Sequence, residues 1–259
     1  MTGTPLNANT PLSKGRIGGE ILLVLGVSLG GSALYSIVNI IDLSTRSKPL
    51  GDQSAALNTS QSSRQVFDLI YQLLPIVLDL VPVALVCYIL WQVSRPHLAR
   101  LGIDFRRPVW DLMFGILLAL GVGAVGIGVY LGGRAIGATV NVSADSLGTY
   151  WWTVPVLLLS AARASLQEEV IVIGYLYARL RDLGWGKWTI ILSTSVFRGS
   201  YHLYQGWGAF VGNFAMGVLF GWLYTRYGRL LPFVIAHFII DAAIFVGYSW
   251  AKATFPGLF

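Results

Sequence analysis

The sequence predicts an all-α polytopic membrane protein, a bundle of about seven transmembrane helices, on three observations. Of its 259 residues, 55% are hydrophobic and only 12% are charged, whereas an average soluble domain is about 25% charged. Each crossing of the bilayer takes about 20 apolar residues, so this length accommodates seven or eight spans. With Cys87 as the single cysteine, a disulfide-rich secreted domain is excluded.

Apolar runs predict the individual spans in chain order. The first run has a basic flank like a signal sequence, but it is too long for one and further spans follow, so it predicts an anchor. Residues 43–65 are rich in Ser, Gln and Asn and predict a flexible loop. A second loop, at 133–150, is where an eighth span or a re-entrant segment would lie. The predicted spans are 17–42, 66–93, 109–132, 151–179, 188–204, 207–224 and 230–250.

The distribution of Lys and Arg predicts the orientation of the bundle. With a cytoplasmic N-terminus and seven spans, the segments on the cytoplasmic side carry most of the 18 basic residues, as the positive-inside rule requires. We therefore expect an integral protein of a bacterial cell membrane, with its N-terminus in the cytoplasm. These loop residues account for the net charge of +6, so membrane lipid is an expected partner and nucleic acid is not.

Ionisable side chains lie inside three of the predicted spans, where a charge costs roughly 2.5–3.5 kcal/mol at the bilayer centre. Residues four apart project from one helix face, and the heights of these groups agree when counted at about 1.5 Å per residue from the basic helix ends. The sequence thus predicts one enclosed polar site. Its members are Glu168 and Glu169 in the fourth span, Arg198 and His202 in the fifth, and His237 and Asp241 in the seventh.

Two further intramembrane charges have structural interpretations. Asp79 lies between Pro75 and Pro82, where it is expected to cap a broken helix. Arg163 is four residues before Gln167, so the two side chains are expected to face each other.

The residue types of the predicted site suit hydrolysis by an activated water. A glutamate in an apolar cavity can act as general base. Imidazoles can bind a metal that activates the water, or donate to a developing oxyanion. Covalent catalysis is not indicated, because Ser165 has no GxSxG elbow around it and Cys87 has no evident His or Asn partner. The HExxH motif of zincins is absent.

The same residues resemble the CPBP intramembrane protease family, which includes type II CAAX prenyl endopeptidases and the bacteriocin-processing or immunity proteins of the Abi group. The family pattern is EExxxR, then FxxxH, then HxxxN or HxxxD on successive membrane helices. The resemblance covers about residues 151–248. It implies that Glu168 activates water, with Glu169 as an electrostatic neighbour. It further implies that His202 positions the water or binds a metal, and that His237 and Asp241 stabilise the oxyanion or act as further ligands.

The resemblance leaves the mechanism open between a glutamate-dependent protease and a metalloprotease. In the second case Glu168, His202 and His237 would hold a divalent metal such as zinc. The implied substrate is a membrane-associated peptide or protein, lipidated or not, and the oligomeric state does not follow. The polar ends and the apolar runs predict a disordered cytoplasmic tail at 1–16, N-terminal transmembrane helices at 17–150 and a C-terminal tail at 251–259. The resemblance implies that the helical core at 151–250 is catalytic.

Two positions depart from the family pattern. Ile173 stands where the family has Arg, and Arg198 stands where it has Phe, with Phe197 one place earlier. We hypothesise that Arg198 supplies the cation that Ile173 cannot, pairing with Glu169 or Glu168. An unpaired charge of either sign would be costly at this depth.

Two other functions remain open. The loss of Arg at position 173 favours a non-catalytic membrane scaffold or immunity protein. A proton-coupled transporter would use the acids and imidazoles as a relay, although the inverted repeat that such transporters often show is not visible in the sequence.

Overall fold

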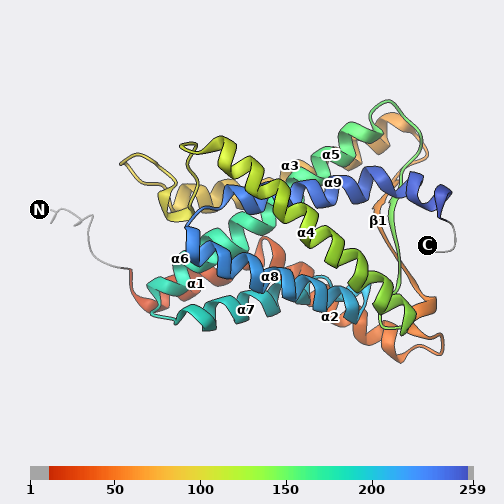
Figure 1. Ribbon diagram of the computed structural model, residues 1–259, viewed down its shortest axis with the longest axis horizontal. Coiled ribbons are helices and arrows are strands. Elements are labelled where there is room, and N and C mark those ends of the chain that lie inside the picture. The colour runs from red at the N-terminus through yellow and green to blue at the C-terminus, as the bar shows by residue number, and fades with distance from the viewer. Residues whose placement is uncertain (1–11, 256–259) are drawn as a thin grey trace, which may run out of the picture.

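The computed structural model describes residues 12–255 as a bundle of helices with a two-stranded sheet at one end (Figure 1). This confirms the predicted class, with the small sheet as an addition. The α-helices are α1 Lys14–Gly26, α2 Leu29–Thr45, α3 Gln65–Ile89, α4 Pro108–Ala135, α5 Thr153–Glu168, α6 Leu176–Asp182, α7 Lys187–Ser200, α8 Trp207–Tyr227 and α9 Leu231–Thr254. The π-helical segment η3 Glu169–Tyr175 joins α5 to α6, and the remaining elements are the 3-10 turns η1 Leu50–Asp52, η2 Ala99–Leu101 and η4 Leu203–Gln205 and the strands β1 Ser54–Thr59 and β2 Asn141–Ser146.

By length and composition, the described helices offer fewer candidate spans than the seven predicted. Four described helices, α3, α4, α8 and α9, are long and apolar enough to cross a membrane, and the bent pair α1 and α2 would make a fifth. The seven predicted spans are therefore not confirmed. Helix α7 has 14 residues, about 21 Å at 1.5 Å per residue, which is shorter than a hydrocarbon core of about 30 Å. The predicted fourth span is divided among α5, η3 and α6.

The first predicted span is bent rather than straight. Helix α1 ends at Gly26, α2 begins at Leu29, and the two axes differ by 63°. The Ser28 hydroxyl donates to the carbonyl of Val24 at 2.6 Å, which satisfies one carbonyl at the break. Gly30 is needed beside the break, because a Cβ there would lie 2.6 Å from the carbonyl oxygen of Leu25.

Both predicted loops contain a strand, so the expectation of a flexible loop at 43–65 is wrong. Strands β1 and β2 pair in parallel, from Ser54 opposite Asn141 to Thr59 opposite Ser146. Gln53 is buried beside the sheet and donates to the carbonyls of Leu43 and Lys48 at 2.8 and 2.9 Å. The second loop, at 133–150, holds β2 and turns, and no span or re-entrant helix.

The two termini also differ from the predicted tails. Helix α1 begins at Lys14, and the Ser13 hydroxyl accepts the Arg16 amide as its N-cap at 3.3 Å, so residues 14–16 are helical. Residues 1–11 of the predicted N-terminal tail lie outside the described residues. Helix α9 continues to Thr254, beyond the predicted end at residue 250, and residues 256–259 are likewise outside the description.

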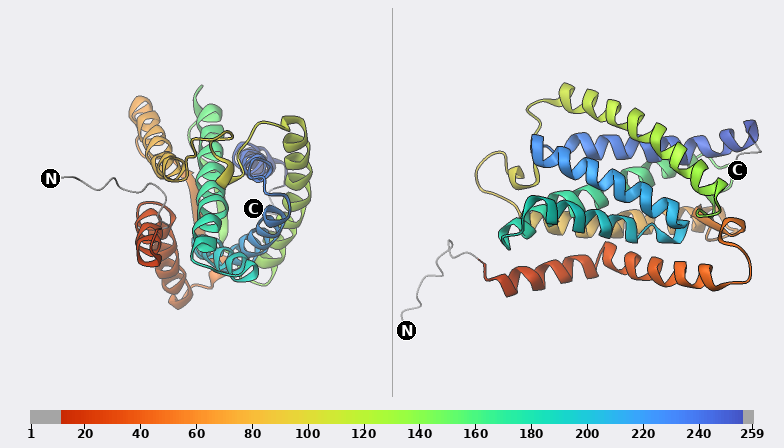
Figure 2. Two further views of the ribbon diagram at one scale, coloured as in Figure 1. Left: turned by 90° about the vertical axis from the view of Figure 1, so that its left-hand side faces the viewer. Right: turned by 60° about the horizontal axis from the view of Figure 1, so that its bottom comes forward.

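Helix α5 lies in the middle of the bundle, with α1, α2 and α3 on one side and α4, α8 and α9 on the other (Figure 2). The segments predicted to share the cytoplasmic side gather at one end. Ion pairs connect them there: Arg179 to Glu20 at 2.7 Å, Arg100 to Asp182 at 2.7 Å, and Arg229 to Asp104 at 3.0 Å. We call this the basic end. That it faces the cytoplasm stays a prediction.

Glycine allows α4 to pack closely on α9, the helix that carries His237. A Cβ on Gly115 would lie 2.7 Å from Ile235 Cγ2 and 3.0 Å from the carbonyl oxygen of Pro232, whereas a Cβ on Gly128 of the same helix would meet nothing within 4 Å. Helix propensity alone would make Gly→Ala stabilising by up to about 1 kcal/mol, but overpacking costs about 1–3 kcal/mol. We expect Gly115→Ala to lower the midpoint of unfolding in detergent and Gly128→Ala to leave it equal or higher. Equal midpoints for the two variants would contradict this account of the α4–α9 contact.

Candidate active site

An ion-paired cluster is sealed in the centre of the bundle, built from η3, α7 and α9. The Arg198 and Glu169 side chains are fully buried. Arg198 Nη1 donates to Glu169 Oε2 at 3.2 Å, and its Nη2 pairs with Glu169 Oε1. His237 Nδ1 lies 2.8 Å from Glu169 Oε1 and 3.1 Å from Arg198 Nη2. These three residues form what we call the inner cluster.

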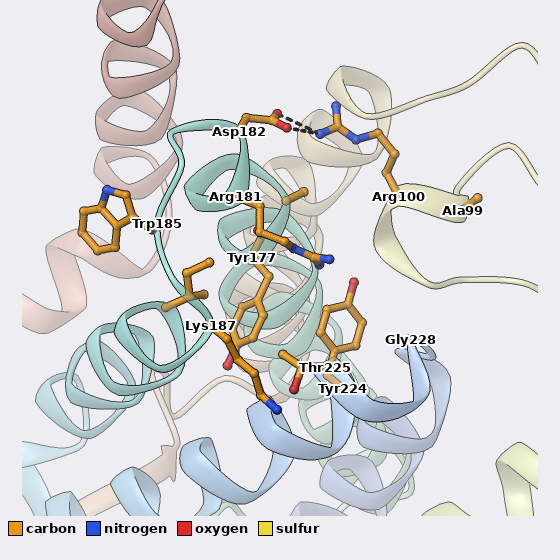
Figure 3. Close-up of a pocket in the computed structure, with 12 residues that line it drawn as sticks. Ala99, Arg100, Tyr177, Arg181, Asp182, Trp185, Lys187, Tyr224, Thr225 and Gly228 are labelled. Atoms are coloured by element: carbon orange, nitrogen blue, oxygen red, sulfur yellow. Dashed lines mark hydrogen bonds and ion pairs between the residues drawn. The ribbon is translucent and has the colours of Figure 1, made fainter.

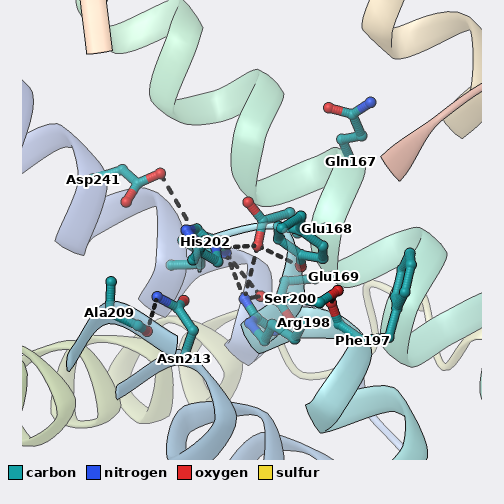
Figure 4. A network of polar contacts seen from close by, with 12 residues as sticks. Gln167, Glu168, Glu169, Phe197, Arg198, Ser200, His202, Ala209, Asn213 and Asp241 are labelled. Carbon is teal, nitrogen blue, oxygen red and sulfur yellow. Dashed lines mark hydrogen bonds and ion pairs between the residues drawn. The ribbon is translucent and has the colours of Figure 1, made fainter. Parts of the chain in front are cut away.

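A second group of side chains lies against the inner cluster and is partly accessible (Figure 4). Glu168, His202 and Asp241 have side chains that are 10%, 17% and 18% exposed. Glu168 Oε2 accepts the Tyr201 hydroxyl at 2.9 Å and lies 3.4 Å from Arg198 Nη2. The same oxygen is 3.6 Å from His202 Nε2. We call Glu168, His202 and Asp241 the outer group.

Helix geometry explains part of this arrangement. His237 and Asp241 lie on one face of α9, as predicted, with 3.4 Å between His237 Nε2 and Asp241 Oδ2. The predicted shared helix face of Arg198 and His202 is wrong, because α7 ends at Ser200 and His202 lies in the turn before η4. The turn is held from outside the motif region: the Ser36 hydroxyl on α2 donates to the carbonyl of Tyr201 at 2.9 Å.

The π-helical segment begins at the second glutamate. Helix α5 ends at Glu168, and η3 runs from Glu169 to Tyr175 with all its residues buried. Such insertions in α-helices are rare and occur frequently at functional sites. Here the junction directs Glu169 into the inner cluster and leaves Glu168 at its accessible edge.

The structure brings together all six residues that the sequence predicted for one site. Arg198 contacts both glutamates and lies closer to Glu169 than to Glu168. These contacts agree with the hypothesis that Arg198 provides the missing cation. Ile173, at the family's Arg position, is buried among apolar side chains of the core. Tyr201 is a site residue that the sequence did not predict, because neither helical spacing nor the family pattern distinguishes it.

Asp79 and Arg163 lie apart from this cluster and pair with each other. Arg163 Nη1 is 3.4 Å from Asp79 Oδ2 and 3.4 Å from Gln167 Oε1, which confirms the expected contact with Gln167. Helix α3 continues through both prolines, so the expectation that Asp79 caps a broken helix is wrong. The pair satisfies two charges that would otherwise be costly in a membrane.

The observed geometry does not fit a metal held by Glu168, His202 and His237. Both ring nitrogens of His237 already face other side chains, Nδ1 toward Glu169 and Nε2 toward Asp241. The Arg198 guanidinium lies between the two glutamates and would repel a divalent cation. Within residues 12–255, no three potential metal ligands converge on one point.

The inner cluster makes a sharp prediction for Arg198. Arg198→Leu leaves two carboxylates in the core without their cation, and we expect a loss of about 3–5 kcal/mol in the free energy of unfolding. Arg198→Lys keeps the charge but not the bidentate contact with Glu169, so this variant should lose less of the free energy of unfolding than Arg198→Leu. Unfolding in detergent with increasing denaturant measures both. The double variant Arg198→Leu/Ile173→Arg should recover part of the loss; wild-type stability of Arg198→Leu alone would contradict the pairing.

A comparison with known families agrees with this site. The family model described as Type II CAAX prenyl endopeptidase Rce1-like matches residues 150–243, a segment that contains all members of the inner cluster and the outer group. Neither a curated protein nor a solved structure matches the chain. The resemblance indicated by the sequence motifs is thus confirmed: over residues 150–243 the chain is similar to the Rce1-like type II CAAX prenyl endopeptidases.

Proposed function

We propose that this protein is an intramembrane endopeptidase that uses Glu168 to activate water for peptide-bond hydrolysis. One observation carries the proposal: of two adjacent buried glutamates, the Glu169 side chain is fully buried against Arg198, while the Glu168 side chain is 10% exposed and lies beside an imidazole. The buried ring nitrogens of His202 have no hydrogen-bond partner among the described residues. A buried polar atom without a partner is costly, so a water or a substrate oxygen is the expected occupant beside this ring.

The proposed reaction begins with a water that lies beside the Glu168–His202 pair and contacts both side chains. Glu168 accepts a proton from this water as its oxygen attacks the carbonyl carbon of the peptide bond. His202 donates a hydrogen bond to the oxyanion that forms on the carbonyl oxygen. When the tetrahedral intermediate collapses, the C–N bond breaks and Glu168 returns the proton to the leaving nitrogen. Protons balance over the cycle, and one water is consumed.

The remaining residues position this pair. Tyr201 donates to Glu168 Oε2 and so fixes the orientation of the carboxylate. Asp241 and Glu169 hold the two sides of the His237 ring, which makes His237 a positioning residue rather than a free donor to the oxyanion. Arg198 offsets the charge of both glutamates in a region of low dielectric.

The substrate class follows from the location of the site among apolar helices. The match to the Rce1-like type II CAAX prenyl endopeptidases supports a membrane-associated peptide substrate, lipidated or not. A water-soluble peptide would have to leave water to reach the outer group, whereas a peptide anchored in the bilayer is already concentrated there.

Replacement of the proposed base tests this function directly. Glu168→Gln removes the proton acceptor while keeping the shape of the side chain, and we expect a loss of at least 100-fold in kcat on a membrane-anchored peptide library. Asp79→Asn, which removes a half-exposed acid that pairs with Arg163 outside the cluster, is the control and should keep its activity. A zinc chelator should leave the wild-type rate unchanged.

The alternatives predict different outcomes of the same comparison. Peptide cleavage that survives Glu168→Gln would overturn the assignment of the base. Cleavage lost to the chelator and restored by zinc would replace the water mechanism with a metal-dependent one. If the wild type cleaves nothing but moves protons in vesicles, the chain is a transporter; if it does neither, the scaffold interpretation holds.

Tyr201 provides a second test that separates positioning from folding. Tyr201→Phe removes only the hydroxyl that contacts Glu168, and the aromatic contact with Phe197 can remain. We expect kcat to fall by about 10- to 100-fold with little change in KM, since a net hydrogen bond to a charged group contributes about 1.5–3 kcal/mol. Tyr130→Phe, which removes a hydroxyl that contacts the Val142 amide outside the site, is the control. Equal kcat for the wild type and Tyr201→Phe would remove Tyr201 from the site.

A further inference from the structure

A separate cavity opens at the basic end of the bundle, away from the proposed active site (Figure 3). It has a volume of about 620 Å³ and lies among α6, α7, α8 and η2. Arg100, Arg181 and Lys187 line it, with Asp182 as the acidic side chain among its lining residues. The cavity is therefore positively charged.

The single carboxylate of this cavity is already neutralised. Asp182 accepts two bonds from Arg100 Nη2, at 2.7 and 2.8 Å, and one from Arg179 at 3.0 Å. Burial raises the pKa of the Asp182 carboxyl, but the hydrogen bonds from these two arginines outweigh burial and hold its pKa below the ordinary value. Asp182 thus stays ionised, and its carboxylate is paired with Arg100 and Arg179 rather than with the other cations of the cavity.

Two cations of the cavity remain without an acidic partner. In the part of the chain that the structure describes, neither Arg181 nor Lys187 forms an ion pair. Arg181 Nε donates to the carbonyl of Tyr177 at 3.1 Å, and its guanidinium points toward the hydroxyl of Tyr224 across the cavity (Figure 3). Two cations and a phenol thus face one space.

The helix dipoles explain the position of Arg181 but not the position of Lys187. Arg181 is in the last turn of α6, where a cation is favoured by the helix dipole. Lys187 is the first residue of α7, and the N-cap Gly186 offers no side-chain cap. A cation at this position opposes the helix dipole. An anion beside Lys187 would satisfy both the lysine and the uncapped amides.

The level of the cavity in the membrane indicates where such an anion comes from. Trp185, which lines the cavity, and Trp188, on the first turn of α7, are 42% and 55% exposed. Exposed tryptophans mark the headgroup level of a bilayer. Basic pockets between helices at this level are suited to anionic lipid headgroups.

We propose that this cavity binds the phosphate group of an anionic phospholipid through Arg181 and Lys187. The proposal is independent of the proteolytic function, because none of the cavity residues belongs to the inner cluster or the outer group. The bound lipid would connect α6, α7 and α8 at the basic end. It would thereby stabilise the position of α7, which carries Arg198, and of η3, which continues into α6 and carries Glu169.

Lipid binding by the intact protein tests this proposal. We expect the double variant Arg181→Gln/Lys187→Gln to bind phosphatidylglycerol about 30-fold more weakly than the wild type, at about 1 kcal/mol for each basic residue. Native mass spectrometry of detergent-purified protein, titrated with phosphatidylglycerol or phosphatidylcholine, measures this. The control is Arg95→Gln/Arg107→Gln, which removes the same charge from exposed positions outside the cavity.

The outcomes separate the lipid from other sources of phosphate. Equal weakening in both double variants, or no weakening in either, would overturn the site. Inorganic phosphate at millimolar concentration is the second arm: if it stabilises the wild type against heat as well as the lipid does, and fails on Arg181→Gln/Lys187→Gln, the ligand is free phosphate and the lipid assignment is wrong. Running both arms on Glu168→Gln protein keeps the result separate from proteolysis.

Discussion

The structure depends on one buried charge network in which Arg198 faces two adjacent glutamates. Removing these charges from water is expensive, and only good geometry with further hydrogen bonds offsets that expense. Glu169 receives such contacts from Arg198 and His237, so η3, α7 and α9 must meet at one point. Because Glu169 takes most of the contacts of Arg198, Glu168 remains at the accessible edge, where it can act on a water.

The N-terminal half, outside the matched segment, holds this arrangement in place at several points. The Ser36 hydroxyl fixes the backbone of Tyr201, next to His202. Glu20 on α1 accepts from Arg179 and from the Tyr175 hydroxyl at 2.9 Å, which ties the end of η3 to α1. An isolated bridge joins Thr139 to Gly206 after η4. These segments lack the family motifs, yet Glu20 contacts η3, which carries Glu169, and Ser36 contacts the turn that carries His202.

Much of the candidate site was predictable from the sequence, because charges in apolar segments must find partners. His237 and Asp241 share a face of α9, as their spacing predicted. The exchange of an arginine between positions 173 and 198 predicted the ion pair of Arg198 with the glutamates. Spacing could not reveal the Tyr201 contact, since it depends on the turn after α7. It also could not identify Arg163 as the partner of Asp79, which lies on another helix.

The sequence by itself determined an all-α membrane protein and the composition of its polar site, because hydropathy and helical period are local properties of the chain. Only the tertiary structure decided which glutamate is sealed and which is accessible, since that depends on how η3, α7 and α9 meet. It also decided the pairing of β1 with β2, because the two short strands are far apart in the chain. The tertiary structure likewise decided the bend between α1 and α2 and the end of α7 at Ser200, because contacts with neighbouring helices and turns fix both features.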